Sequence, residues 1–293
     1  MPMGPAVTQT AQKIATGLDS FPLLAIPLFV LSGQIMGQGG IAKRLINMAK
    51  GLVGNLPGGL AFVNIISCML FGAISGSAVA ATSAIGSFMI PEMNKAGYDK
   101  NFSAAANATA ATTGLLIPPS NVLIVYSLAS GNVSVAALFI AGYLPGVLTG
   151  GLLMVSAGIL ALMNNYRGGE KIPLKMKLKR SGEAFLSLLL IIIVIGGIIA
   201  GIFTATEAAV VAVLYSLILA VVIYKEVKVN QLPELLLKTA ITNSVVMLLV
   251  GTSMALSWIM AYENIPQAIS QFMLTLSDNP IIILLIINFV LLA

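Results

Sequence analysis

Two long apolar segments of this chain, residues 60–93 and 102–130, are each interrupted near the middle by small polar residues, glycine or proline. The first is interrupted at residues 72–77 (GAISGS) and the second at residues 112–121 (TTGLLIPPSN). Backbone that stops being helical at membrane depth is tolerated only where it is buried in protein or lines a cavity. In secondary transporters, such broken helices carry the substrate and coupling-ion sites. These interruptions therefore constrain the fold more than any other feature.

The composition places both segments in a membrane protein. Of the 293 residues, 58% are hydrophobic and only 9% are charged, and several apolar runs reach the roughly 20 residues that a spanning helix needs. We therefore expect an all-α polytopic membrane protein. The expected spans lie near residues 21–36, 135–163, 185–203, 208–224 and 241–260.

The ionisable residues exclude several kinds of site. The chain has no histidine and one cysteine, Cys68, which excludes Cys/His metal sites, histidine-based catalysis and an internal disulfide. Because Cys68 lies in an apolar run, we expect it to be a buried packing residue. Since the spans also hold no paired carboxylates, we expect no enzyme activity. The net charge of +5 comes from basic residues between the apolar runs, which indicates membrane topology and not nucleic-acid binding.

The distribution of basic residues predicts the orientation. Residues 164–180 carry six lysines and arginines against one glutamate, so we expect this loop to be cytoplasmic. Counting back two spans puts both ends of the 60–93 segment on the same side. Residues 41–53 alternate apolar and basic positions at helical spacing, which predicts an amphipathic helix in the membrane interface.

The length of segment 60–93 favours a hairpin. Each half has about 13 residues, or roughly 20 Å of helix, which is too short for a hydrocarbon core about 30 Å thick. We therefore expect a re-entrant helical hairpin that enters and leaves on one side. The Ser-Gly-Ser at its middle both ends one helix and begins another. The alternative is one long helix with a glycine kink.

The order of elements from residue 231 repeats the order from residue 8: interfacial helix, span, amphipathic helix, proline, apolar run. Pro57 and Pro280 mark equivalent points, and 280 − 57 gives an offset of 223. The second copy would start from the opposite membrane face, as in the inverted repeats of transporters. Because Ala293 corresponds to Leu70, the second repeat is incomplete, and we expect the chain to be a fragment of a longer protein.

The two interruptions expose backbone groups that could bind ions. Pro118 and Pro119 have no N–H, so we expect the carbonyls of Gly114 and Leu115 to lose their helical partners. Free carbonyls there and at Gly76, beside serine and threonine hydroxyls, would suit Na⁺. The helix that begins near Ser77 would favour an anion, which predicts a carboxylate-bearing solute. Alternatively, both interruptions are plain kinks.

Five other residues with polar groups lie in or near the spans. Glu207 is either a functional intramembrane acid or, as we favour, part of a helix cap with a nearby threonine. Asn64 and Asn107 are either ligands or contacts between helices. Trp258, with Tyr262 one turn later, is expected at the membrane interface.

The same stretches resemble a known family, the large membrane subunit of tripartite ATP-independent periplasmic (TRAP) transporters. The matching pieces are residues 39–93 (including GAISGSAVA), TTGLLIPPSN, ALFIAGYLPG and GIFTATEAAVVAVLY, and the resemblance covers nearly all of the chain. Ala205 replaces the proline that the family usually has before TEAA, which should affect loop rigidity more than ion binding.

The resemblance implies Na⁺-coupled import of an organic acid across the bacterial inner membrane by an elevator mechanism. Its implied partners are a periplasmic substrate-binding protein and a small four-helix membrane subunit. The implied Na⁺ ligands are Ser75, Gly76, Ser77, Thr112, Gly114 and Pro118. We take Ser77, Ser120 and Asn121 as candidates for binding the solute. Because IPPSN differs from the IPPSI form of dicarboxylate members, a sugar acid such as sialic acid is favoured over a dicarboxylate.

This resemblance also implies a domain organisation. Residues 1–56 would form a scaffold and arm segment, 57–134 the hairpin and broken helix of a transport domain, and 135–260 the following spans. Residues 261–293 would form an amphipathic helix and the start of a second hairpin. Two alternatives remain: a divalent-anion/Na⁺ symporter-like carrier that works without a binding protein, and an ion-only channel or exchanger.

Overall fold

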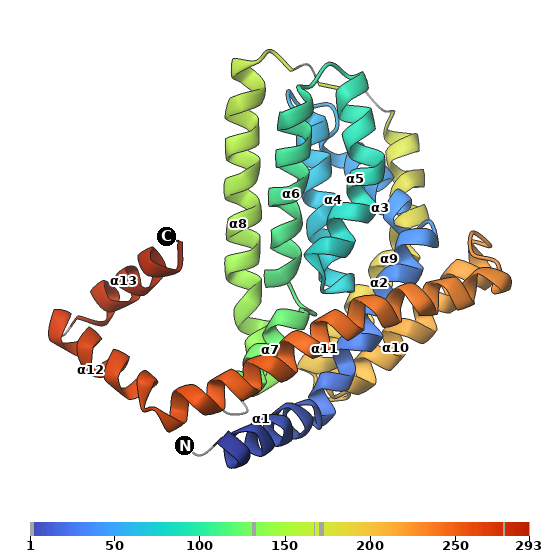
Figure 1. The fold of residues 1–293 in the computed structure, drawn as a ribbon. Coiled ribbons are helices and arrows are strands. Elements are labelled where there is room, and N and C mark those ends of the chain that lie inside the picture. The colour runs from blue at the N-terminus through green and yellow to red at the C-terminus, as the bar shows by residue number, and fades with distance from the viewer. Residues whose placement is uncertain (1–2, 131–132, 167, 170–172, 278, 293) are drawn as a thin grey trace. The chain divides into compact units, whose positions relative to one another are not determined.

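A computed structural model describes residues 3–130, 133–166, 168–169, 173–277 and 279–292 (Figure 1). All regular elements within these ranges are helices, as the composition predicts. Five of these helices are long and apolar enough to cross a membrane, and one further pair qualifies as a bent span. The chain is therefore an all-helical polytopic membrane protein. It divides into two compact units, Phe21–Ser244 and Met1–Ser20 with Val245–Ala293.

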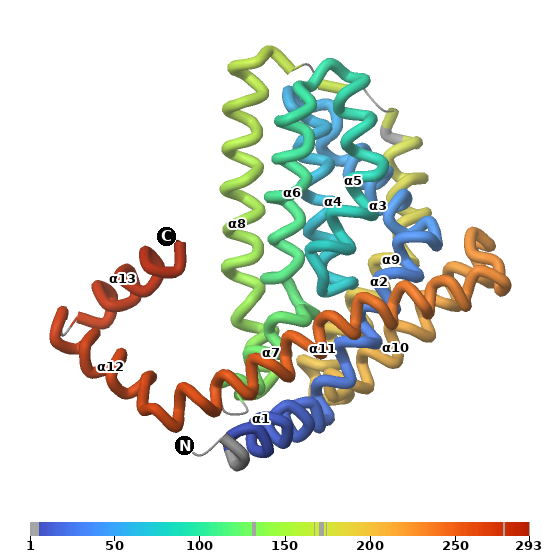
Figure 2. The backbone as a smooth tube through the Cα atoms, in the orientation of Figure 1, coloured from blue at the N-terminus to red at the C-terminus, as the bar shows by residue number. Residues whose placement is uncertain are grey.

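The larger unit holds most of the helices, and its backbone can be followed in Figure 2. Its elements, in chain order, are a 3₁₀ turn (Phe21–Leu24), α2 (Ala25–Gln38), α3 (Ile41–Val53), α4 (Gly59–Ser75), α5 (Ala78–Lys95), α6 (Lys100–Leu116), α7 (Asn121–Ala129), α8 (Val135–Met163), α9 (Leu174–Ile199), α10 (Ala205–Leu217), a π-helical turn (Ile218–Ile223), a 3₁₀ turn (Val229–Gln231) and the first part of α11 (Leu232–Tyr262).

The smaller unit contains α1 (Met3–Leu18), the rest of α11, α12 (Ile265–Leu276) and α13 (Pro280–Leu292). Close packing joins α1 to α11, since a Cβ atom on Gly17 would lie 2.7 Å from Met254 Cγ. The rings of Trp258 and Tyr262 are 6.0 Å apart. Their place at the membrane interface stays a prediction.

Helices α4 and α5 form a helical hairpin. Two residues separate them at one end. At the other end, Lys50 Nζ, in the last turn of α3, lies 2.6 Å from Glu92 Oε2 near the end of α5. The chain therefore reverses at the interruption, and the single kinked helix is not what forms. Helix α6 runs beside this pair in Figure 1. The depth of the hairpin in the membrane stays a prediction.

Both interruptions are shorter than the sequence suggested. The first was expected over residues 72–77, but α4 continues to Ser75. The second was expected from Thr112, but α6 continues to Leu116. Small polar residues are tolerated inside a helix whose neighbours pack closely, so the helices end only at Gly76 and at the prolines.

The predicted loop 164–180 is also shorter, because α9 begins at Leu174 and includes the basic stretch from Lys175 to Arg180. Lysine and arginine are good helix formers, and their long side chains can reach water from a helix that continues into the apolar region. Arg167, Glu170 and Lys171 lie outside the described residues.

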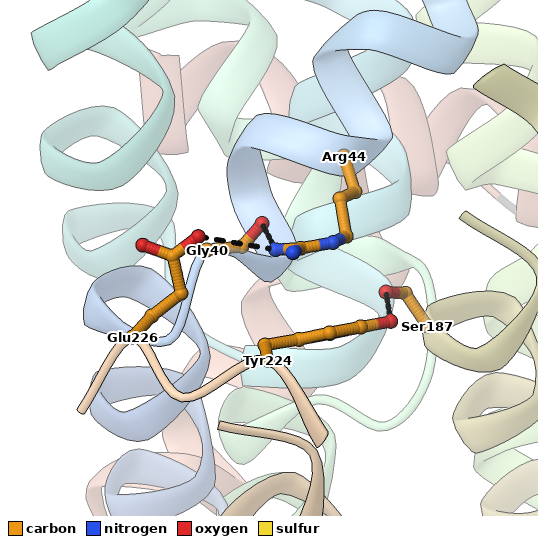
Figure 3. A network of polar contacts seen from close by, with 5 residues as sticks. All are labelled: Gly40, Arg44, Ser187, Tyr224 and Glu226. Atoms are coloured by element: carbon orange, nitrogen blue, oxygen red, sulfur yellow. Dashed lines mark hydrogen bonds and ion pairs between the residues drawn. The ribbon is translucent and has the colours of Figure 1, made fainter. Parts of the chain in front are cut away.

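Helix α3 is amphipathic as expected, but its apolar face packs on protein. Ile41, Leu45 and Met48 are buried. A polar network holds the other side to the end of the π-helical turn (Figure 3). The Arg44 guanidinium donates to Gly40 O at 2.9 Å, lies 3.7 Å from Glu226 Oε1 and stacks over the Tyr224 ring at 3.5 Å. The expected position of this helix in the membrane interface stays a prediction.

Glu207 takes the structural role that the sequence favoured. The Glu207 N–H donates to Thr204 Oγ1 at 3.3 Å, and Glu207 Oε2 accepts from Thr204 N–H at 2.8 Å. This reciprocal pair is a capping box at the start of α10. Cys68 is fully buried, as expected of a packing residue.

Candidate functional site

The first interruption is a glycine stop followed by a serine start. Gly76 adopts the left-handed conformation (φ 61°), and its N–H donates to Gly72 O at 2.8 Å. Glycine suits this position because it carries no Cβ to clash. Ser77 then turns to an extended conformation, and its Oγ accepts from Ala80 N–H at 3.3 Å. The start of α5 is therefore capped directly at the interruption.

The second interruption depends on proline. Residues 117–120 separate α6 from α7, and the two helices are bent by 48°. Pro118 cannot donate to the Gly114 carbonyl four residues before it. The Leu115 carbonyl, which we expected to lose its partner, instead accepts from Ser120 Oγ at 2.5 Å. The carbonyl has lost its helical N–H partner, but it is not free as we expected, because the serine hydroxyl replaces the missing N–H.

These two interruptions meet in space. The Asn121 N–H, at the start of α7, donates to Gly76 O at 3.3 Å. A Cβ atom on Gly76 would lie 2.7 Å from Pro119 O and 3.3 Å from Asn121 Oδ1. The hairpin tip thus fits against the proline turn because it presents no side chain there.

Backbone contact between α4 and α6 brings the interruptions together. A Cβ atom on Gly72 would lie only 2.2 Å from Gly114 Cα, so the two helices touch through paired glycines. Helix α2 closes another side, where a Cβ on Gly33 would lie 2.7 Å from Ser75 Cβ. Neither Gly33 nor the contact of Gly72 with Gly114 could be predicted, because nothing in the sequence marks which helices touch.

The predicted Na⁺ ligands are brought together in part. Ser75, Gly76, Gly114 and Pro118 are buried, and Ser77 is half-buried. Thr112 is exposed, and its hydroxyl donates to Thr109 O at 2.7 Å, so its side chain does not join the group.

Two of the predicted solute-binding residues sit at the proline turn. Ser120 is fully buried, and its hydroxyl donates to the Leu115 carbonyl. Asn121 Oδ1 is buried and has no hydrogen-bond partner among the described residues. A buried acceptor of this kind is costly unless something donates to it. Asn121 is therefore the strongest candidate of the set.

No formal charge lies in the chain around either interruption, because residues 57–91 and 101–134 contain no aspartate, glutamate, lysine or arginine. Within these two segments, the field comes from the helix ends and free carbonyls. Helices α5 and α7 both begin here, with partial positive charge at their first turns. Helices α4 and α6 both end here, with carbonyls that carry partial negative charge. The site can thus attract an anion and a cation side by side.

Asn107 and Asn64 lie further along the hairpin. Asn107 Nδ2 donates to Thr82 O at 3.0 Å, so this residue connects α6 to α5 as the helix-contact alternative predicts. Asn64 is fully buried, and neither polar atom of its side chain has a partner among the described residues. Its role stays open.

Comparison with known proteins gives the family. The whole chain, residues 1–293, matches the family described as the tripartite ATP-independent periplasmic transporter, DctM component. The chain belongs to this family. It is thus a DctM component, a transporter subunit and not an enzyme.

Relatives of this DctM component carry names that differ in solute. The chain is 53% identical over 292 residues to the uncharacterized protein YgiK of Salmonella typhimurium, covering 100% of the chain and 67% of the relative. It is 42% identical over 282 residues to the sialic acid TRAP transporter large permease SiaM of Vibrio cholerae (96% and 66% covered). It is 39% identical over 287 residues to the C4-dicarboxylate permease DctM of Pseudomonas aeruginosa (98% and 67%). The chain spans about two thirds of the length of these relatives.

Proposed function

We propose that this DctM component carries an organic acid across the bacterial inner membrane together with Na⁺. The observation that carries the proposal is the meeting of two helix interruptions, through Asn121 N–H and Gly76 O, in uncharged apolar segments. Such paired interruptions place helix ends at membrane depth, where transporters hold ions and solutes. The relatives named for sialic acid and C4-dicarboxylates support an acid as the solute.

The Na⁺ site would lie between the end of α4 and the end of α6. Carbonyl and hydroxyl oxygens are hard ligands that suit an alkali cation. Ser75, Gly76 and Ser77 would supply them from the tip, and Gly114 with Pro118 from the proline turn. Gly76 O accepts one bond from Asn121 and keeps a second lone pair. Thr112 is the least supported of the proposed Na⁺ ligands. Its side chain is exposed, so only its backbone carbonyl would be left to bind the ion.

A carboxylate would bind at the starts of α5 and α7. Ser77 and Ser120 cap these helices, so a carboxylate placed there meets unpaired N–H groups of the first turns. Asn121 Oδ1 would accept from a solute hydroxyl, which favours a sugar acid such as sialic acid over a plain dicarboxylate.

The bounds of α3 and α12 support a repeat. Adding the offset of 223 to α3, 41 + 223 and 53 + 223, gives 264–276, and α12 occupies Ile265–Leu276. Gly40 before α3 and Asn264 before α12 are both left-handed. In this proposal α13 begins a second hairpin, inserted from the opposite face, and the α4–α5 hairpin is re-entrant.

An elevator motion would carry residues 57–134 past a scaffold that includes α2. Helix α2 meets the hairpin through small residues: Gly33 lies against Ser75, and a Cβ on Gly37 would lie 3.5 Å from Ala84 Cβ. Close contact without interlocking side chains is suited to sliding. A periplasmic binding protein would deliver the solute, and a small four-helix membrane subunit would enlarge the scaffold. As part of this proposal, the other domain boundaries stay at residues 1–56, 135–260 and 261–293.

Uptake in proteoliposomes tests the proposal. The full-length protein with its small subunit should take up sialic acid or succinate only when Na⁺ and the binding protein are both present. Uptake without the binding protein would instead favour a divalent-anion/Na⁺ carrier. Na⁺ conductance without solute uptake would favour a channel.

Two variants test the ion site. Ser77→Leu and Pro119→Ala should each raise the Na⁺ concentration for half-maximal uptake by about tenfold, the loss expected for about 1.4 kcal/mol of binding free energy. Ser156→Leu and Pro145→Ala, both on α8, are the matched controls and should leave it unchanged. Unchanged Na⁺ activation in Ser77→Leu and Pro119→Ala would remove the proposed site.

A further inference from the structure

A polar pocket of about 390 Å³ lies between α2, α5 and the first part of α11, within the larger unit. Gln34 and Gln38 line it from α2, Ser83 and Ser87 from α5, and Lys238 from α11. Glycines and alanines fill the positions between them. Its volume lies in the range of sites for small molecules, and is too small for a folded partner.

The polar walls follow from helical spacing. Residues 34 and 38, and residues 83 and 87, are four apart, so each pair projects from one face of its helix. Gly33 and Gly37 on α2 let that helix approach the hairpin closely, since their Cβ positions would lie 2.7 Å from Ser75 Cβ and 3.5 Å from Ala84 Cβ. Two amides and two hydroxyls thus face a common volume, a lining that can both donate and accept hydrogen bonds.

Lys238 supplies the charge of the pocket. It is the one ionisable residue among those that line it. Its Nζ lies 2.7 Å from Glu234 Oε1, and its side chain is 50% exposed. An ammonium group has three donors, so the pairing with Glu234 leaves two for a ligand. Although Glu234 offsets part of the lysine charge, the two remaining ammonium donors and four neutral polar groups suit a small hydroxylated anion.

The pocket also adjoins the interruption at the hairpin tip. Ala80 is one of its lining residues, and the Ala80 N–H is the group that Ser77 Oγ caps. An anion leaving the start of α5 therefore needs to move only about one helical turn, roughly 5 Å, to reach the pocket.

We propose that this pocket is a second binding site for the carboxylate solute, on its way to or from the hairpin tip. Lys238 binds the carboxylate, and Gln34, Gln38, Ser83 and Ser87 bind its hydroxyl groups. The proposal rests on the proposed function, since it takes the solute to be an organic acid. It adds residues of α2 and α11 to those that select the solute.

Thiol labelling tests this site without any transport assay. Ser83→Cys places an exposed thiol in the pocket, while the native Cys68 is buried and reports the background in the unaltered protein. The full-length protein in detergent is labelled with an anionic sulfonatoethyl or a cationic trimethylammonium-ethyl methanethiosulfonate. The quantity measured is the ratio of the two rates.

Removing the lysine charge should lower this ratio. Lys238→Gln in the Ser83→Cys protein is expected to reduce the anion-to-cation ratio by about three- to tenfold, as loss of one nearby charge predicts. Lys228→Gln removes an equal charge outside the pocket and should change it little. A neutral methyl reagent should label all three proteins at one rate, which shows that the pocket keeps its shape. An equal ratio in the two charge variants would overturn the proposal.

Protection by solute completes the test. Sodium sialate or sodium succinate should slow labelling of Ser83→Cys relative to sodium chloride at equal ionic strength, and Lys238→Gln should abolish that protection. Charge preference without protection by either acid would mean that no carboxylate binds, and would also overturn the proposal. If instead uptake needs no Na⁺ or binding protein while protection holds, the coupling proposal fails and this one stands.

Discussion

The two interruptions achieve the same result by opposite means. At the hairpin tip the chain reverses within two residues, because Gly76 can take a left-handed conformation. At the proline turn the chain bends by 48° over four residues and continues, because Pro118 and Pro119 cannot donate to the preceding turn. One interruption lacks a side chain, and the other lacks a donor. They fit together because the missing side chain of Gly76 leaves room for the Pro119 carbonyl.

The two interruptions also differ in the side-chain hydrogen bonds that hold them. The proline turn is reinforced by a second bond, since Ser120 both caps α7 and donates to Leu115 O. The tip has a cap from Ser77, on a half-buried residue, and a longer bond from Ser75 Oγ to Ser77 O at 3.5 Å. The second bond is the shorter one at the proline turn, 2.5 Å against 3.5 Å at the tip.

The largest effect is expected from Gly76→Ala. An alanine there faces both the cost of a left-handed φ, about 1–2 kcal/mol, and a contact of 2.7 Å with the Pro119 carbonyl oxygen. We expect uptake to fall to background and the unfolding temperature to drop. Gly97→Ala is the matched control, since Gly97 is also left-handed but has no neighbour within 4 Å. Equal effects of both variants would show that the fit between the interruptions does not matter.

A somewhat smaller effect is expected from Gly72→Ala. The added methyl would lie 2.2 Å from Gly114 Cα, so α4 and α6 must separate, at a cost of about 1–3 kcal/mol. Thermal unfolding of the purified protein measures the loss. Gly151→Ala on α8 has nothing within 4 Å and should be neutral or slightly stabilising, because alanine is the better helix former. A Gly72→Ala protein as stable as the control would contradict backbone contact here.

How much of this site the sequence reveals depends on the range of each interaction. Local effects are predictable, because they involve only neighbouring residues. The residue types alone predict a helix end at Gly76, a helix start at Ser77 and a turn at the two prolines. The bond from Ser120 to Leu115 O spans five residues and forms only on a bent backbone. The residue types alone do not predict it. The contact between Gly72 and Gly114 joins distant segments, so only the folded chain reveals it.

The same limit applies to the amphipathic helix. The pattern in residues 41–53 predicts one apolar face, and α3 has it. Whether that face meets lipid or protein depends on what else folds against it. In the structure Ile41 and Leu45 are fully buried, whereas Leu52 is 61% exposed.

A third prediction compares the two caps directly. Ser120→Ala removes the cap of α7 and also leaves the Leu115 carbonyl without its donor, which should cost about 2–3 kcal/mol. Ser77→Ala removes a cap alone and should cost about 1 kcal/mol. Chemical or thermal unfolding of both proteins measures the difference. Equal losses would mean that the proline turn gains nothing from its second bond.

The smallest effect is expected at the opposite end of the hairpin. Lys50→Gln breaks the pair with Glu92, whose side chain is 41% exposed. Exposed ion pairs are worth about 0–1 kcal/mol, so the unfolding temperature should change little and should respond weakly to salt. Glu92→Gln serves as the reciprocal variant, and the double variant should lose no more than the larger single loss. If either single variant instead abolished uptake as Gly76→Ala should, the foot of the hairpin and not its tip would control the site.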